Sequence, residues 1–322
     1  MAYRLKASDG SVAAALSRIA VERLAKAEMR LSGAGLTGAR GHRLHAAVWE
    51  ARKEVKKVRG LLRLVRGAMP DYAEWNGALR DAARTVSPFR DLWARVEACD
   101  AAIALCPDAP ALVRLREEMA DRADRAARRA ESVDRARDFR DALAVIRDAA
   151  EDWTLDRDGW AALAPGVTRA LARGRADMRR AVRTGDETLR HDWRKRVKYH
   201  WYHARLLSPL WPEGMAPRLA LADRTATLLG DHRNLGEFIA DPLVAGTLSF
   251  SRARLGERIE AERARLLDEA GAAARLLFAE APEAVAAQWG AWYALSDLPG
   301  SAAHRERGAR AGRSDRTKEA SV

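Results

Sequence analysis

Residues 189–207 read LRHDWRKRVKYHWYHARLL, and their charged side chains are almost all of one sign. The residues that fall on nearly one face at helical spacing are His191, Arg194, Lys195, Lys198 and Arg205. The stretch has six lysines and arginines and a single acid, Asp192. A helix that is only solvated usually mixes charges at i to i+4, so that ion pairs form. The balancing negative charge must therefore come from another source.

The same pattern occurs upstream at residues 48–65, which read VWEARKEVKKVRGLLRLV. The two stretches align at an offset of 142, which places Trp49 opposite His191. The further matches are Arg52 with Arg194, Lys53 with Lys195, Val55 with Val197, Lys56 with Lys198, and Arg63 with Arg205. The segments VSPFRDLWARV and LLGDHRNLGEFI match at an offset of 143 and place Arg90 opposite Arg233. Such an internal repeat indicates two copies of one structural unit.

The composition predicts an all-α protein. Ala, Arg, Leu and Glu dominate, and no stretch alternates apolar and polar residues for long enough to suggest a strand. We divide the 322 residues into a first helical-bundle repeat at 1–152, a second at 153–299, and a disordered basic tail at 300–322. One long charged helix is expected from Ala109 to about Asp152, and the next is expected to begin at Pro165.

Charge and cysteine content narrow the class of protein. The chain has 57 Lys and Arg against 45 Asp and Glu, a formal charge of +12, which favours a polyanionic partner. An Arg-rich solvated surface would account for the total charge but not for its clustering. Cys99 and Cys106 are seven residues apart, roughly 10 Å along one helix, so we expect two buried free thiols in a reducing compartment.

Other features of the sequence concern localisation and cofactors. No run of about 18 apolar residues predicts a membrane span, and no Cys/His spacing predicts a zinc site. Charges interrupt the only apolar patch of the N-terminus, so we expect no signal peptide and a cytoplasmic protein. We expect no cofactor and no metal.

The first basic helix, expected from about Arg43 to Gly67, places its cations beside its apolar face. The apolar row is Val48, Ala51, Val55, Val58, Leu62 and Val65. The basic row is Arg52, Lys56, Arg59, Arg63 and Arg66, displaced by one residue or about 100° around the helix. Cations that flank a core can line a groove between packed helices, where partial exclusion of water strengthens their attraction for an anion. A structural network of ion pairs with other helices is the alternative.

At these residues the sequence resembles the CHAD domain, the conserved histidine α-helical domain. The resemblance rests on the two basic helices and on SPFRDL and LGDHRNL, and it covers roughly residues 9 to 298. It implies two pseudo-symmetric helical bundles around a basic central channel, and binding of inorganic polyphosphate. Polyphosphate granules are a further expected partner of such a protein. The candidate binding residues are Arg52, Lys53, Lys56, Arg59, Arg63, Arg90, His191, Arg194, Lys195, Lys198, Arg205 and Arg233.

The chain departs from the family pattern at three positions. Trp49 stands where the first repeat would have the signature histidine, although His45 or His42 could contribute there. Trp201 stands opposite Arg59. Asn234 replaces the acid that the first repeat has as Asp91.

Three other functions are alternatives to polyphosphate binding. Nucleic-acid binding would use Trp193, Tyr199, Trp201 and Tyr202 to stack bases, but their helical spacing favours core positions. An enzyme that uses His191 as nucleophile or acid would need a cluster of carboxylates to hold a catalytic metal. Asp192 and Asp231 are isolated in the sequence, and Asp223 has at most Asp81 as its counterpart in the other repeat. A scaffold protein at a polymer granule or cell surface is compatible with polyphosphate binding, and it differs from a simple binding protein mainly in its cellular context. We expect a polyphosphate-binding protein that is not an enzyme.

Overall fold

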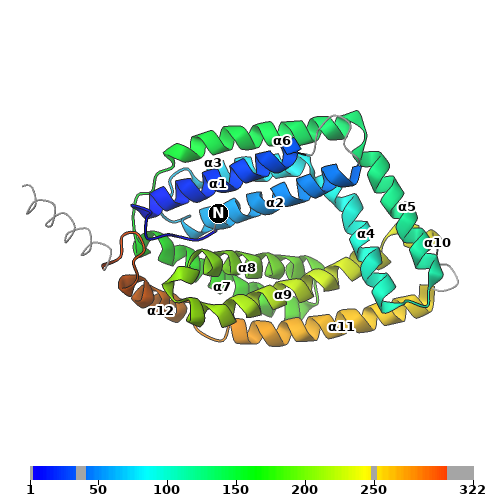
Figure 1. Ribbon diagram of the computed structural model, residues 1–322. Coiled ribbons are helices and arrows are strands. Elements are labelled where there is room, and N and C mark those ends of the chain that lie inside the picture. The colour runs from blue at the N-terminus through cyan, green and yellow to red at the C-terminus, as the bar shows by residue number, and fades with distance from the viewer. Residues whose placement is uncertain (1–2, 34–40, 248–251, 303–322) are drawn as a thin grey trace, which may run out of the picture.

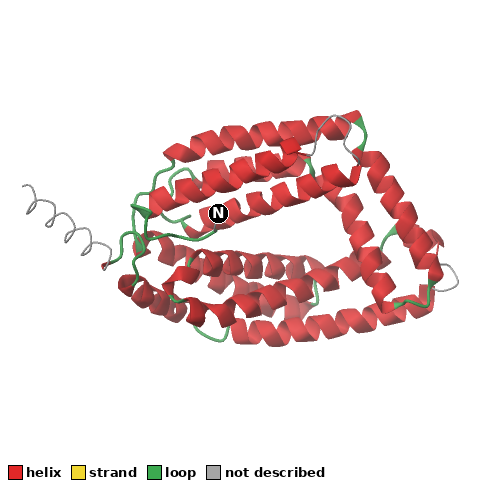
Figure 2. Cartoon of the chain, viewed as in Figure 1, coloured by secondary structure: helices red, strands yellow, loops and turns green. Residues whose placement is uncertain are grey.

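The structure, a computed structural model, describes residues 3–33, 41–247 and 252–302, and all regular secondary structure in these ranges is helical (Figure 2). The predicted all-α class is confirmed. The α-helices are α1 Val12–Gly33, α2 Gly41–Leu64, α3 Tyr72–Thr85, α4 Ser87–Leu105, α5 Pro110–Ala127, α6 Ala130–Ala149, α7 Trp160–Thr184, α8 Glu187–Leu206, α9 Pro212–Ile239, α10 Pro242–Thr247, α11 Arg252–Leu277 and α12 Pro282–Leu295. Short 3₁₀ turns at Ala150–Asp152 and Ser208–Leu210 connect some of them.

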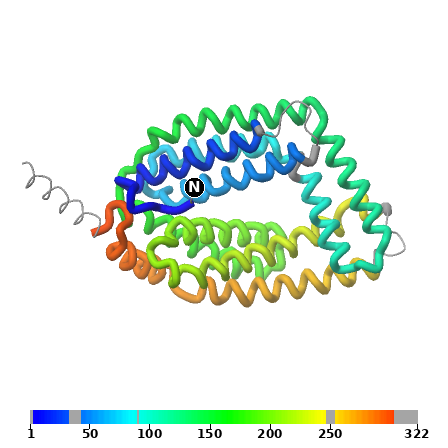
Figure 3. Tube along the Cα trace, in the orientation of Figure 1, coloured from blue at the N-terminus to red at the C-terminus, as the bar shows by residue number. Residues whose placement is uncertain are grey.

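The helices form two groups that lie against each other. Helices α1, α2, α3 and α6 form one group, and α7, α8, α9 and α11 form the other (Figure 1). Helices α4 and α5 close one end together with α10, and α12 packs on α7 at the other end. The N-terminal segment runs along the line between the groups (Figure 3), where Leu5 N–H donates to Leu206 O at 3.1 Å.

The apolar rows of the two basic helices fix how these helices pack. All six members of the row predicted for α2, from Val48 to Val65, are buried. On α8, Trp193 and Val197 are buried in the same core. Burial of apolar surface contributes about 25 cal/mol per Å², so these rows determine which faces of α2 and α8 carry the remaining cations.

Two hydrophobic cores stabilise the fold, and each contains residues from both halves of the chain. The larger core includes side chains of α1, α2, α7 and α8. The smaller core joins α4 and α5 to α9, α10 and α11, and it contains Cys99 and Cys106. Both thiols are buried and free, as predicted, and burial raises the pKa of Cys99 to about 11.

Three boundaries differ from the sequence predictions. The predicted helix from Ala109 to Asp152 is two helices, α5 and α6, because Arg129 adopts an extended conformation before α6. Helix α7 begins at Trp160 and includes Pro165, since the apolar residues of its first turns are buried. Gly300 and Ser301, expected at the start of the tail, are packed, and Ser301 Oγ donates to Ser296 O at 2.6 Å. Residues 303–322 lie outside the described part.

Candidate anion-binding site

The connection from α7 to α8 sets where the second basic helix begins. Gly185 ends α7 with a φ of +67°, a left-handed conformation that glycine adopts without a steric penalty. Asp186 then caps α8, because its carboxylate accepts a hydrogen bond from Leu189 N–H at 2.9 Å. The predicted loop Thr184-Gly185-Asp186 therefore starts α8 and fixes the positions of His191 and Arg194 on it.

Helices α2 and α8 touch directly at two matched positions of the repeat. A Cβ on Gly60 would lie 2.9 Å from Cβ of Tyr202, so the close approach needs a glycine there. His203 Nε2 lies 3.1 Å from Gly60 O, and it must carry the proton because a carbonyl only accepts. Burial lowers the pKa of His203 to about 4. A neutral histidine therefore joins the two helices.

Matched cations of the two helices make matched contacts. Arg52 donates to Ala83 O, and Arg194 Nε donates to Ala226 O at 3.0 Å. The two arginines are 142 residues apart and the two acceptors 143, which are the offsets of the sequence repeat. Each of these contacts ties a basic helix to the helix that follows it.

Lys53 and Lys195 also form corresponding pairs. Lys53 binds Glu50 at 2.7 Å, and Lys195 binds Asp192 at 2.5 Å, in each case three residues back on the same helix. All four side chains are about one third to two fifths exposed, at 43%, 39%, 43% and 34%. A surface pair of this kind contributes little to stability, on the order of 0.5 kcal/mol. The paired acid balances the positive charge of each lysine, so Lys53 and Lys195 are the weakest candidates in the predicted set.

A cavity of about 260 Å³ lies at the start of α8, and we call it the His191 pocket. Helices α8, α9 and α11 line it, and its basic and histidine side chains are Arg190, His191, Arg194, His232, Arg233 and Arg263. Two acids, Glu187 and Glu237, lie beside them. Four guanidinium groups against two carboxylates leave a local excess of positive charge.

His191 is held in one tautomer within this pocket. Arg233 Nη1 lies 3.0 Å from His191 Nδ1. Since a guanidinium can only donate, Nδ1 accepts and Nε2 carries the proton. Burial, and then the charges of Arg233, Lys195 and Arg194, lower the pKa of His191 to about 4. At neutral pH the imidazole is therefore uncharged and offers one N–H donor to a ligand.

The acids of the pocket orient its arginines. Glu187 accepts from Arg190 and from Arg263, each at 2.6 Å. Glu237 accepts from two nitrogens of Arg233, at 2.7 and 2.5 Å. The guanidinium of Arg263 also lies where a Cβ on Gly236 would come within 3.0 Å of it. Trp93 occupies the matched position of the first repeat, so the glycine leaves room for Arg263 in the second repeat only.

The matched lysines Lys56 and Lys198 both lie over indole rings. Lys56 Nζ is 5.5 Å from the ring centroid of Trp49, and Lys198 Nζ is 4.6 Å from that of Trp201. Lys198 also approaches Asp223 at 3.6 Å, and burial lowers the pKa of its ammonium. A lysine on an aromatic face is held by cation–π attraction and still offers donors to an anion.

In the first repeat, aromatic side chains occupy the positions that correspond to His191 and Gly236 of the His191 pocket. The imidazole of His45 stacks between Trp93, at a centroid distance of 4.9 Å, and Trp49, at 6.5 Å. His45 thus lies beside the position of the missing signature histidine. The side chains of His42 and Arg90 lie outside the described residues, although the backbone of Arg90 belongs to α4.

The structure does not bring all predicted residues into one pocket. His191, Arg194 and Arg233 share the His191 pocket. Arg63 stacks on Tyr199 at 4.1 Å and lines a separate cavity, and Arg205 lines a third. Arg59 donates to Asn76 Oδ1 at 3.2 Å, and burial and the neighbouring Arg63 lower its pKa to about 10.

Several basic residues that line these cavities lie outside the set of binding residues predicted from the sequence. In the cavity around Arg63 they are Arg66, Arg169, Arg173 and Arg196. In the His191 pocket they are Arg190, His232 and Arg263. Arg263 comes from α11, which has no repeated motif in the sequence, so no sequence pattern indicated its position in the pocket.

The comparison with protein families identifies the class. A family model of the CHAD domain matches residues 22–238 of the 322, and the chain therefore belongs to the CHAD domain family. The comparison with curated proteins gives no match, and neither does the comparison with solved structures. Within the described ranges, no helix is long and apolar enough to cross a membrane. The same residues contain no group of three His, Cys, Asp or Glu side chains that could hold a metal ion.

Proposed function

We propose that this protein binds inorganic polyphosphate along α2 and α8 without transforming it. The observation that carries the proposal is the His191 pocket, where guanidiniums outnumber carboxylates and a neutral histidine presents an N–H. A linear polyphosphate is a closely spaced row of charges, and a row of cations repeating about every 5.4 Å along a helix can follow it. Arginine binds phosphate oxygens in a bidentate manner, and lysine acts as a mobile point charge.

In this proposal α2 and α8 belong to two pseudo-symmetric halves that face a shared basic channel. Two observations support it. Arg52 and Arg194 make matched contacts, and the matched positions Gly60 and Tyr202 meet each other. Equivalent positions meet only close to a two-fold axis, so an approximate axis would run between the helices. Membership of the CHAD domain family supports the same arrangement and the same ligand.

The alternatives receive less support from the geometry. Trp193 is fully buried and Tyr202 nearly so, and Lys198 lies over Trp201, which leaves few rings for base stacking. Asp192 and Asp223 are each paired with a lysine, which argues for binding over metal-assisted catalysis. Association with granules in the cytoplasm is part of this proposal and stays a prediction.

The test is calorimetric binding of long-chain polyphosphate to the wild type and to an Arg194→Ala/Lys198→Ala variant, at two salt concentrations. We expect the variant to bind at least about 100-fold more weakly, because each of the two lost charge-assisted contacts is worth roughly 1.5–3 kcal/mol. Wild-type affinity should fall steeply as salt rises.

The matched control is Lys53→Ala/Lys195→Ala, which also removes two positive charges from α2 and α8. Each of these lysines is already paired with an acid on its own helix, so the expected loss is within about threefold. Thermal unfolding of all variants checks that they fold. Equal losses in the two variants would reduce the effect to net charge and contradict a defined site. Wild-type affinity no higher than for an equally charged nucleic acid would overturn the choice of ligand.

Binding is also expected to strengthen as pH falls, through His191. A bound polyanion raises the pKa of this imidazole above its value of about 4 in the free protein. The protonated form then binds more tightly, and affinity rises from the pKa of the complex down to about pH 4. His191→Gln keeps a hydrogen-bond donor but cannot gain a proton. The variant should therefore bind polyphosphate as the wild type does at pH 8, and its affinity should rise less between pH 7 and 5. His232 titrates in both proteins, so parallel slopes would rule His191 out as the source.

A further inference from the structure

A second basic cavity lies away from the His191 pocket, and we call it the Lys57 cavity. It has a volume of about 460 Å³ and lies between the N-terminal segment, α1, α2 and α8. Its five cations are Arg4, Arg23, Lys26, Lys57 and Arg205. Tyr3, Trp201 and Ser208 complete the lining, which contains no carboxylate among the described residues. Of the five cations, Arg205 alone belongs to the set of binding residues predicted from the sequence.

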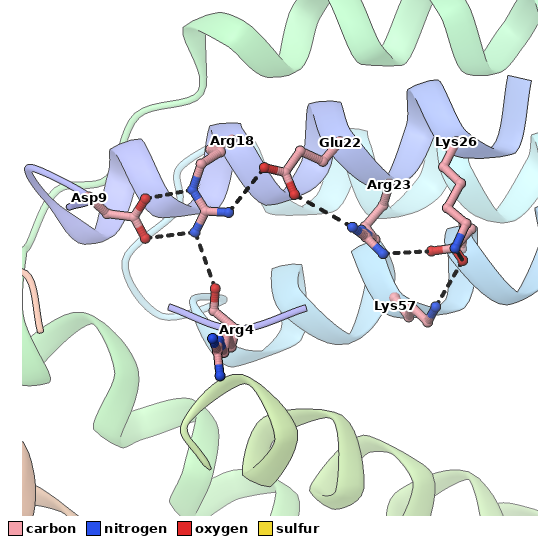
Figure 4. Close-up of polar contacts among 8 residues, drawn as sticks. Arg4, Asp9, Arg18, Glu22, Arg23, Lys26 and Lys57 are labelled. Atoms are coloured by element: carbon pink, nitrogen blue, oxygen red, sulfur yellow. Dashed lines mark hydrogen bonds and ion pairs between the residues drawn. The ribbon is translucent and has the colours of Figure 1, made fainter. Parts of the chain in front are cut away.

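Three of the cavity's cations, Arg23, Lys26 and Lys57, belong to an ion cluster between α1 and α2 (Figure 4). Glu54, 2% exposed, is approached by Lys57 at 2.8 Å and by Arg23 and Lys26 at 3.6 Å each. Arg23 is itself 3% exposed. Tyr3 Oη donates to Lys57 O at 2.7 Å, which fastens the N-terminal segment to α2. Arg23, Lys26 and Lys57 are therefore held in place before any ligand arrives, and these three side chains lose less entropy on binding.

The charges of this cluster do not balance. Glu54 pairs with three cations, Arg23, Lys26 and Lys57. Glu22 pairs with Arg23 and with Arg18, and Arg18 is also bound by Asp9 at 2.6 Å. Arg4 and Arg205 have no acid within 4 Å in the part of the chain that the structure describes. Like charges gathered in a partly enclosed cavity repel each other unless an anion enters.

We propose that the Lys57 cavity binds a run of two or three phosphoanhydride-linked phosphates. Its volume is in the range of small-ligand sites, and the positive charge that Glu54 and Glu22 leave unbalanced can be matched by a few adjacent phosphates. A nucleotide base has little to stack on, because Lys198 lies over Trp201 at 4.6 Å and Tyr202 packs edge-on to it at 5.3 Å. The ligand is either a free oligophosphate or a segment of a longer chain. For the longer chain the inference rests on the proposed function, and for the free ligand it stands on the cavity alone.

Tripolyphosphate binding by calorimetry tests the proposal with an Arg4→Gln/Lys26→Gln variant. Both positions lie outside the set predicted from sequence, and Lys57 and Arg23 still hold Glu54 in the variant. We expect affinity to fall at least about tenfold, since each residue supplies a charge-assisted contact. The control Arg30→Gln/Arg180→Gln removes the same charge from exposed positions of α1 and α7 and should bind as the wild type does. Tryptophan fluorescence should respond to tripolyphosphate in the wild type and lose that response in Trp201→Phe.

Long-chain polyphosphate distinguishes the two sources of ligand. If Arg4→Gln/Lys26→Gln weakens both ligands, the cavity holds part of the polymer. If it weakens only tripolyphosphate, the cavity serves free oligophosphates. The Arg194→Ala/Lys198→Ala variant separates this inference from the proposed function: unchanged polymer binding in it counts against the His191 pocket alone. The proposal is overturned if the wild type does not bind tripolyphosphate, or if the Arg4/Lys26 variant binds it as the control does.

Discussion

Replacing Gly166 by alanine is expected to lower the free energy of unfolding by at least about 3 kcal/mol, the upper end of the cost of over-packing. Gly166 lies in α7 where that helix crosses the end of α2. A Cβ there would be 1.9 Å from Leu64 O and 2.6 Å from Leu64 C. Both are backbone atoms, which cannot turn aside as a flexible side chain can. The helices would have to separate, and the contact that joins the two helix groups would weaken.

Urea or thermal unfolding followed by circular dichroism measures this effect. The control is Gly77→Ala in α3, where a Cβ would have nothing within 4 Å. Alanine favours helix over glycine by about 1 kcal/mol, so the control should be as stable as the wild type or slightly more stable. A Gly166→Ala protein as stable as the control would show that α2 and α7 do not approach as closely as described.

The repeat made the two basic helices predictable, because cations and apolar residues recur along them at fixed spacing. The six apolar positions of α2 are buried as their periodicity predicted. The break between α5 and α6 was not predictable in the same way. Residues 127–132, ARRAES, contain neither proline nor glycine, and the turn is held instead by Ser132 Oγ, which donates to Ala126 O at 2.8 Å. Local propensity favours a continuous helix there, and packing on different neighbours overrides it.

The residues of the His191 pocket were predictable only where they belong to the repeated motifs. Spacing placed His191 and Arg194 together, and the repeat added Arg233. It gave no information on residues that reach the same cavities from other helices, such as Arg263 in α11 or Lys26 in α1. Their positions depend on how helices pack, which a single sequence does not encode as a pattern. Repeat matching also grouped Arg63 with Arg205, although the two line separate cavities.

Divergence between the repeats is visible in one pair of matched positions. Glu54 of α2 corresponds to Arg196 of α8 at the offset of 142. Each forms an ion pair with the preceding helix, but with the signs reversed: Glu54 with Arg23 of α1, and Arg196 with Asp177 of α7 at 3.0 Å. The helix pair is held in the same manner in both halves. The acid of the first half lies beneath the Lys57 cavity, and this gives Glu54 an effect on binding as well as on stability.

Glu54→Gln is therefore expected to change stability and anion affinity in opposite directions. Removing one partner of a buried ion pair costs about 3–5 kcal/mol, because the remaining charges stay buried without compensation. Here the cations that lose this carboxylate are Arg23, which keeps its contact with Glu22 at 3.5 Å, and the less deeply buried Lys57, so the cost falls toward the lower end of this range. The same change makes the Lys57 cavity one charge more positive, so tripolyphosphate should bind more tightly to the folded variant. A ligand that binds only the folded state raises the midpoint of unfolding. Tripolyphosphate should thus raise this midpoint more for Glu54→Gln than for the wild type.

The control for this prediction is Asp177→Asn, which removes the acid of the corresponding pair in the second half. It should leave the response to tripolyphosphate unchanged, because Asp177 lies outside the lining of the Lys57 cavity and is not among the acids beneath it. Thermal unfolding of the three proteins, with and without tripolyphosphate, makes the comparison. A Glu54→Gln variant that loses stability but responds no more strongly than the wild type would place the ligand elsewhere. Glu54 would then hold α1 against α2 without acting on an anion site.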